Sequence, residues 1–124
     1  MASKTVIEAI REAMDEEMER DPSVFIIGED VGNRGGVFLA TDGLFKKYGQ
    51  DRVIDSPLAE SCIVGVAIGA AVNGMRPIAE VQFADFIAPA MNQISEEAAR
   101  LCYRTAGDFS LPMGTMAPWG GRVH

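Results

Sequence analysis

The spacing of apolar residues near the start of the chain predicts a helix followed by a buried strand. Thr5 and Glu8 have the spacing of a capping box at a helix start. Residues 24–27 (Val-Phe-Ile-Ile) are apolar without interruption, as in a parallel strand that is buried on both faces. Between them an apolar stripe recurs at helical spacing before Asp21-Pro22 ends the pattern; its members are Val6, Ile10, Met14 and Met18.

The remaining sequence alternates between helical and strand patterns. Strands alternating with helices predict an α/β fold with a doubly wound, mostly parallel sheet. The expected elements, in order, are a glycine loop over 32–36, a short helix over 41–48, a strand at 53–54, a helix over 58–73, a strand over 78–83, a helix from Pro89 to near Gly107, a strand over 111–118 and a loop over 119–124.

The helix expected over 58–73 has little polar face, so we expect it to be buried on nearly every side. Gly65 and Gly69 would let another helix approach closely. Its cover can come from this chain or from a partner subunit, and the pattern leaves both open. Cys62 and Cys102 fall in apolar helical patterns and have no cysteine or histidine cluster nearby, so they are expected to be buried and reduced.

The composition narrows the classes of partner. The 124 residues allow one domain, and 48% of them are hydrophobic, as in a globular chain. The net charge is −7 and no basic run exceeds Lys46-Lys47, which argues against a nucleic-acid or anionic membrane surface. No signal-peptide pattern is present, and the longest apolar run is shorter than the ~20 residues of a membrane span. We therefore expect a cytoplasmic protein.

Glu60 is the first candidate for chemistry. Residues 62–73, which follow it, contain no ionisable carboxylate or base, so burial should raise the pKa of Glu60 unless a partner compensates. A carboxyl group of this kind can hold or share a proton near neutral pH. The alternative is a structural role, because a negative charge in the first turn of a helix suits the helix dipole. Residues 29–30, 56–60 and 83–86 all lie at or just after expected strand ends, so they can share one edge of the sheet.

Ten short segments carry a resemblance, in order along the chain: Gly-Glu-Asp-Val at 28–31, Gly-Gly-Val-Phe at 35–38, Ala-Thr-Asp-Gly-Leu at 40–44, Tyr-Gly at 48–49, Arg-Val at 52–53, Asp-Ser-Pro-Leu-Ala-Glu at 55–60, Gly-Met-Arg-Pro at 74–77, Ala-Glu-Val-Gln-Phe-Ala-Asp-Phe at 79–86, Gln-Ile at 93–94 and Ala-Ala at 98–99. Together they resemble the beta subunit of the thiamine-diphosphate-dependent 2-oxoacid dehydrogenases, the decarboxylating component of the pyruvate and branched-chain complexes. The resemblance implies that residues 1–124 are the N-terminal part of a transketolase-like pyrimidine-binding domain, with an incomplete sheet.

The resemblance also implies roles for four residues. Glu60 matches the catalytic glutamate that hydrogen-bonds the aminopyrimidine ring nitrogen of thiamine diphosphate. Leu58 and Gln82 match residues that line the pyrimidine pocket, and Phe86 matches an aromatic that stacks on the ring. For Gln82 and Phe86, ordinary packing at a strand end is the alternative. No metal site is expected in this chain, because in the family the alpha subunit holds the diphosphate and magnesium.

The partners implied by the resemblance are an alpha subunit in an α2β2 assembly, a lipoyl-bearing acyltransferase core that accepts the acyl group, and a pyruvate or branched-chain 2-oxoacid substrate. Alone, the chain is expected to be inactive. Two alternatives stay open. One is a different transketolase-like thiamine enzyme subunit, and the other is a truncated, non-catalytic interaction module.

The sequence departs from the family pattern near its end. His124, the only histidine, matches a histidine of the glycine-rich loop, and the catalytic histidine of the family would follow a few residues beyond it. Met116 stands where an arginine is usual, and Gly114 stands where a threonine often helps to form a potassium site. Local ion binding near these positions is therefore in doubt.

Overall fold

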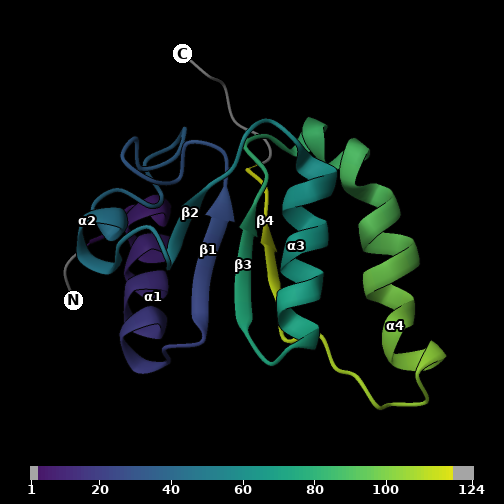
Figure 1. Cartoon of the computed structure of the whole chain (residues 1–124). Helices are drawn as coiled ribbons and strands as arrows, with labels where there is room; N and C mark the ends of the chain where they lie inside the picture. The colour runs from purple at the N-terminus through teal and green to yellow at the C-terminus, as the bar shows by residue number, and fades with distance from the viewer. Residues whose placement is uncertain (1–2, 119–124) are drawn as a thin grey trace.

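Four parallel strands form the centre of the computed structural model, which describes residues 3–118 (Figure 1). They are β1 (Val24–Gly28), β2 (Val53–Asp55), β3 (Arg76–Glu80) and β4 (Gly114–Met116), in the spatial order β2-β1-β3-β4. Each neighbouring pair runs parallel. Helices cover both faces of the sheet (Figure 1). The predicted doubly wound α/β fold is therefore confirmed.

Helices α1 (Val6–Arg20) and α2 (Leu44–Tyr48) cover one face of the sheet. The predicted capping box is confirmed, because Glu8 N–H donates to Thr5 Oγ1 at 3.2 Å and Thr5 N–H donates to Glu8 Oε2 at 2.7 Å. The apolar stripe on α1 is buried only in its C-terminal half, where Met14 and Met18 are its buried members. In the N-terminal half, Val6 and Ile10 remain exposed.

Arg52, just before β2, holds the end of α1 against the sheet. Its Nη2 donates to Met18 O at 2.9 Å and to Asp21 O at 3.0 Å, and its Nε donates to Val24 O at 2.7 Å. Carbonyls at a helix C-terminus lack partners within the helix, so a guanidinium with several donors satisfies them. This cluster fixes the turn between α1 and β1.

Helix α3 (Glu60–Val72) covers the other face. It begins two residues later than predicted, at Glu60 itself. Within this chain only part of α3 is covered, because Val66 is exposed. Cover of the open face by a partner subunit stays a prediction. Cys62 lies on the open side and Cys102 is exposed on α4 (Ala99–Arg104), so their predicted burial is wrong. Because the sequence of α3 is apolar on every side, it could not indicate which face of the helix would pack against the sheet. Residues that are buried on α3 include Ile63, Val64, Ala67, Ile68 and Ala71.

The segment between β3 and β4 differs most from the prediction. Strand β3 ends at Glu80 rather than at position 83, and the chain continues as the 3₁₀ helix η1 (Ala84–Ala90). Pro89 lies inside η1 and does not open a helix. Proline has no N–H to donate to an α-helical hydrogen bond, so the backbone around Pro89 is a 3₁₀ helix. The π-helix η2 (Gln93–Ala98) and α4 follow it. Strand β4 is shorter than the predicted 111–118.

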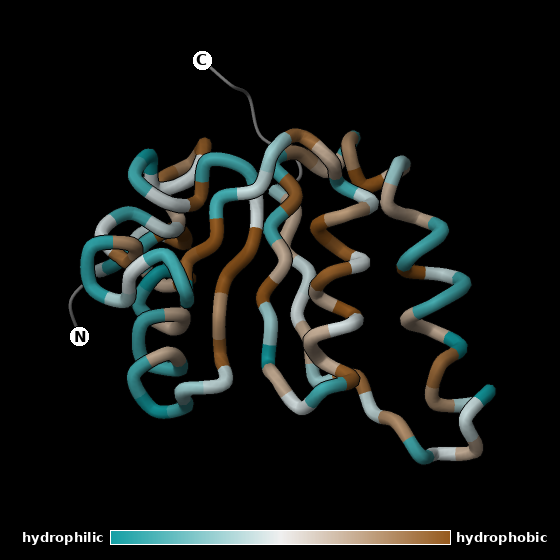
Figure 2. Tube along the Cα trace, viewed as in Figure 1, coloured by the Kyte–Doolittle hydropathy of each residue, from teal (hydrophilic) through white to brown (hydrophobic). Residues whose placement is uncertain are grey.

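Two further features complete the fold. Apolar residues concentrate in the central strands, whereas α1 is largely polar (Figure 2). Across residues 3–118, no helix combines the length and apolar character that crossing a membrane requires. The loop predicted over 119–124, with His124, lies outside the described residues.

Candidate functional site

The strand order creates a topological switch point between β1 and β3. The connection that leaves β1 passes over the α1 face to β2, whereas the connection that leaves β3 runs through η1, η2 and α4 on the α3 face to β4. In open parallel sheets, ligands bind beyond the carboxyl ends of the strands where connections diverge in this way. Residues 29–30 follow β1 at this edge, as the sequence predicted. Residues 81–83, expected within the strand, also follow β3 at this edge because β3 ends at Glu80.

Glu60 is the first residue of α3 and only 9% of its surface is exposed. Its position follows from the register of the sheet: β2 ends at Asp55, opposite Gly28 of β1, so residues 56–59 carry the chain over the edge into the helix. The expected placement of Glu60 at the edge, beside apolar sequence, is confirmed. Its role toward a ligand is not tested by its position.

Glu29 is a second buried carboxylate beside Glu60, and sequence reasoning did not include it among the site residues. Burial is the largest cause that raises the pKa of Glu29, and the charge of Glu60 raises it further. The N–H of Ala59, next to Glu60, donates a hydrogen bond to the Glu29 carboxylate and works in the opposite direction. The two carboxylates therefore lie close enough for the charge of Glu60 to act on Glu29. The position of Glu29 directly after β1 was the available signal in the sequence.

Gln82 and Asp30 connect the ends of β3 and β1. Gln82 Nε2 donates to Asp30 Oδ2 at 3.3 Å, and Arg34 Nη1 donates to the same oxygen at 2.9 Å. Asp30 has a left-handed backbone, with φ of 58°. The Asp30 carboxylate therefore fixes the half-buried Gln82 at the crevice between the strands.

Leu58 and Phe86 supply exposed apolar surface at the same edge, with 79% and 45% of their surfaces open. Phe86 packs edge-to-face on Phe83 with ring centroids 5.6 Å apart. The hydroxyl of Ser61, in the first turn of α3, donates to the carbonyl of Pro89 in η1. This bond holds the element that carries Phe86 beside the start of α3.

Glu80 is a third buried acid that sequence reasoning missed. It ends β3, is 1% exposed, and burial raises its pKa to about 7. It lies beneath the loop that follows β1, away from Glu60. Gly36 of that loop has no Cβ, and a Cβ built there would lie 3.2 Å from Glu80 Oε1.

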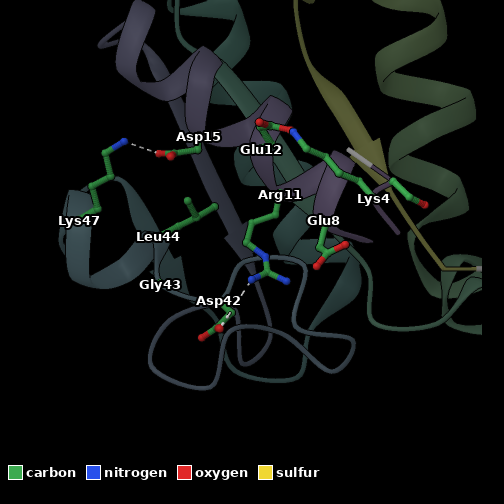
Figure 3. Close-up of a pocket in the computed structure, with 10 residues that line it drawn as sticks. Lys4, Glu8, Arg11, Glu12, Asp15, Asp42, Gly43, Leu44 and Lys47 are labelled. Atoms are coloured by element: carbon green, nitrogen blue, oxygen red, sulfur yellow. Dashed lines mark hydrogen bonds and ion pairs between the residues drawn. The ribbon is translucent and has the colours of Figure 1, made fainter. Parts of the chain in front are cut away.

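Two surface hollows are lined by charged residues. One, of about 530 Å³, lies between α1 and α2 (Figure 3). Its charges are largely paired with one another: Lys47 Nζ lies 2.6 Å from Asp15 Oδ1, and Arg11 Nη1 lies 3.7 Å from Asp42 Oδ2. The other, of about 410 Å³, is lined by Asp30, Arg34, Gly36 and Val37 and lies at the switch-point edge. The second hollow therefore adjoins the candidate site.

The chemistry of this edge suits a heterocyclic ring that lies between apolar surfaces. Such a ring could accept a hydrogen bond from the buried carboxyl group or share a proton with it. The edge does not suit a diphosphate, because Glu29, Asp30 and Glu60 are acidic and Arg34 is already paired with Asp30. Within residues 3–118, no three histidine, cysteine, aspartate or glutamate side chains gather closely enough to hold a metal ion. The residues present thus fit the aminopyrimidine part of thiamine diphosphate.

Comparison with known families defines the class of protein. Residues 2–122 match the family described as the transketolase pyrimidine binding domain. The chain belongs to this family, in agreement with the parallel sheet and the position of the edge.

Among individual relatives, the chain is similar to beta subunits of 2-oxoacid dehydrogenases, as the sequence predicted. It is 60% identical over 124 residues to the 2-oxoisovalerate dehydrogenase subunit beta of Bacillus subtilis, and 52% identical to that of Pseudomonas aeruginosa. It is 50% identical to the pyruvate dehydrogenase E1 component subunit beta of Acholeplasma laidlawii. In each case the whole chain is covered, but it spans only 35–38% of the relative's length.

Proposed function

We propose that this chain contributes the aminopyrimidine half of a thiamine diphosphate site in a 2-oxoacid dehydrogenase. The observation that carries the proposal is the buried Glu60 carboxylate at the switch-point edge, in a chain 60% identical to a 2-oxoisovalerate dehydrogenase beta subunit. In this proposal residues 1–124 form the N-terminal part of the pyrimidine-binding domain. A cytoplasmic location stays a prediction.

Thiamine diphosphate, when bound, supplies the nucleophilic carbon and the electron sink for decarboxylation of a 2-oxoacid. Glu60 would hold and share a proton at a ring nitrogen of the aminopyrimidine. Glu29 supports this role as a neighbouring carboxyl group whose pKa is raised, first by burial and then by the charge of Glu60.

Three further residues would bind and orient the ring. Leu58 and Phe86 would exclude water from its faces, since both expose apolar surface at the edge. Gln82 would line the same pocket with its amide fixed by Asp30. Glu60 is the catalytic residue of this proposal, and Leu58, Gln82 and Phe86 complete the cofactor contacts.

The proposal requires an alpha subunit that holds the diphosphate and magnesium, as in an α2β2 assembly. The acidic edge supports this division, because its carboxylates would repel a diphosphate. The proposed reaction consumes pyruvate or a branched-chain 2-oxoacid and delivers the acyl group to a lipoyl-bearing acyltransferase core. The chain alone would then be inactive.

Isothermal titration of thiamine diphosphate in the presence of magnesium tests the proposal. The chain is titrated alone and as a complex with an alpha subunit, with complex formation verified by sedimentation. We expect binding heat only from the complex. A verified complex that gives no heat would contradict the cofactor site and would favour a non-catalytic interaction module. Binding accompanied by turnover of a ketose instead of a 2-oxoacid would favour another thiamine enzyme.

A further inference from the structure

Glu80 is a buried acid for which the proposed function has no use. It is the last residue of β3, and its Oε2 has no hydrogen-bond partner among the described residues. A buried carboxylate without donors is costly, because the charge loses its hydration and gains nothing in return. The protonated form avoids most of that cost.

The surroundings of Glu80 come from β1 and from the loop over residues 31–41. Gly28 is its register partner in β1, and a Cβ on Gly28 would lie 2.9 Å from the Glu80 Cβ. From the loop, a Cβ on Gly36 would lie 3.2 Å from Glu80 Oε1 and 3.4 Å from Thr41 Oγ1. The carboxyl group therefore sits directly beneath the loop, in space that exists because two residues are glycines.

Two hydrogen-bond donors of this loop are engaged elsewhere. The Thr41 hydroxyl donates to Val31 O at 2.7 Å, and the Gly36 N–H donates to Asp30 O at 2.8 Å. Neither is free to stabilise an ionised Glu80. Loop and carboxyl group thus fit together best when Glu80 keeps its proton.

Among residues 3–118, no charged group contributes to the pKa shift of Glu80. Its neighbours are uncharged: Gly28 from β1, Gly36 from the loop, and Met116 as its register neighbour in β4. Consistent with this, burial is the single cause given by the structure for the rise of its pKa to about 7.

We propose that Glu80 is a positioning residue that, in its protonated form, holds the 31–41 loop closed over β3 and loosens it on ionisation. The loop reaches the candidate site through Asp30, whose carbonyl accepts the Gly36 N–H and whose carboxylate accepts the Gln82 amide. Loosening the loop therefore disturbs the orientation of Gln82. The consequence for cofactor binding rests on the proposed function, whereas the response of the loop does not.

The sign of the pH effect follows from proton linkage. With the loop closed the pKa of Glu80 is about 7, and in the opened loop we expect a return toward its ordinary value of 4.5. The closed loop binds more protons between these values, so it is most stable below pH 4.5 and loses stability as the pH rises toward 7. Above pH 7 the loss levels off.

Hydrogen exchange on the full chain, read by NMR as protection factors, tests the proposal without any cofactor. Protection of the 31–41 amides should fall about fortyfold between pH 5 and pH 7. In Glu80→Gln it should change by no more than about threefold, because the amide cannot ionise. Glu16→Gln, the same substitution at an exposed position, should behave like wild type. Wild-type protection that does not vary with pH, or Glu80→Gln that varies like wild type, would overturn the proposal.

Two wild-type signals make the test independent of how well the variant folds. The carboxyl carbon of Glu80 should titrate near pH 7, and the side-chain amide of Gln82 should shift with the same midpoint. A Glu80 midpoint near 4.5 would overturn the proposal, and a Gln82 amide that ignores the transition would overturn the positioning role. If the loop responds as expected but a verified complex binds no thiamine diphosphate, the proposed function alone fails.

Discussion

Gln82 donates a hydrogen bond from Nε2 to Asp30 Oδ2 at 3.3 Å, which joins the end of β3 to the end of β1 across 52 residues of sequence. The two strands are neighbours in the sheet, and their connections to the rest of the chain diverge at this point. The crevice at the switch point is therefore lined by two side chains that fix each other. Four predictions test this region and the fold that supports it.

Replacing Glu60 by Gln should remove the carboxyl group that shares a proton with the cofactor. In the assembly with the alpha subunit, kcat for decarboxylation should fall about 10²–10⁴-fold, the usual scale for losing a general acid or base. Steady-state kinetics with a 2-oxoacid measures the loss. Glu16→Gln, an exposed control, should leave kcat unchanged. Normal turnover by the Glu60 variant would show that this residue is not the catalytic group.

Replacing Glu29 by Gln should flatten the dependence of stability on pH. Burial and the charge of Glu60 raise the pKa of Glu29, so its contribution to stability is present at low pH and is lost as the pH rises through the raised pKa. Gln keeps an oxygen for the Ala59 N–H but carries no charge. Urea unfolding at pH 5 and pH 8 should show a smaller decrease for the variant than for wild type. An equal decrease in both would mean that Glu29 ionises freely in the fold.

Replacing Arg52 by Ala should destabilise the chain by about 2–3 kcal/mol, because carbonyls at the end of α1 and the start of β1 lose charged donors. Urea unfolding followed by circular dichroism measures the change. Arg20→Ala is the matched control. Arg20 is an exposed arginine paired with Glu17, and its removal should cost less than about 0.5 kcal/mol. Similar losses in both variants would contradict a special role for Arg52.

Replacing Gly36 by Ala should cost more than replacing Gly43 by Ala. Both glycines have left-handed backbones, with φ of 78° and 81°, so the conformational strain of about 1–2 kcal/mol is shared. A Cβ on Gly43 meets nothing within 4 Å, whereas one on Gly36 lies 3.2 Å from Glu80 Oε1. The difference in unfolding free energy therefore isolates the contact with Glu80. Equal losses of unfolding free energy in the two variants would show that the loop shifts to accommodate the added methyl group at no cost.

Strong local patterns predicted much of the fold. The capping box of α1 and the uninterrupted apolar run of β1 depend on residues next to each other in sequence, and both were confirmed. The order β2-β1-β3-β4 was not predicted, because pairing between distant strands leaves no local pattern. Without that strand order, the sequence could predict a shared edge but not that the crevice lies between β1 and β3.

The errors have specific physical causes. The apolar pattern continued past Glu80, so the end of β3 could not be located, and the turn toward η1 began earlier than expected. Pro89 is a good first-turn residue, but here the 3₁₀ helix had already begun before it. Cys62 was expected to be buried because α3 is apolar on all sides; only the position of the sheet decides which side is covered.

The candidate site was predicted unevenly for a similar reason. Glu60 stands out because the sequence after it is uncharged, and the structure places it at the edge. Glu29 and Glu80 look like ordinary charged residues at the ends of strands. Their importance depends on burial, and for Glu29 on the nearby charge of Glu60, neither of which is visible in the sequence.

The left-handed backbone of Asp30 restricts which amino acids this position can hold. Side chains that branch at Cβ clash in that conformation, whereas glycine adopts it freely and Asp and Asn tolerate it. Of these three, only Asp and Asn offer an oxygen to the Gln82 amide. Asp or Asn at this position therefore satisfies both the left-handed backbone and the Gln82 amide.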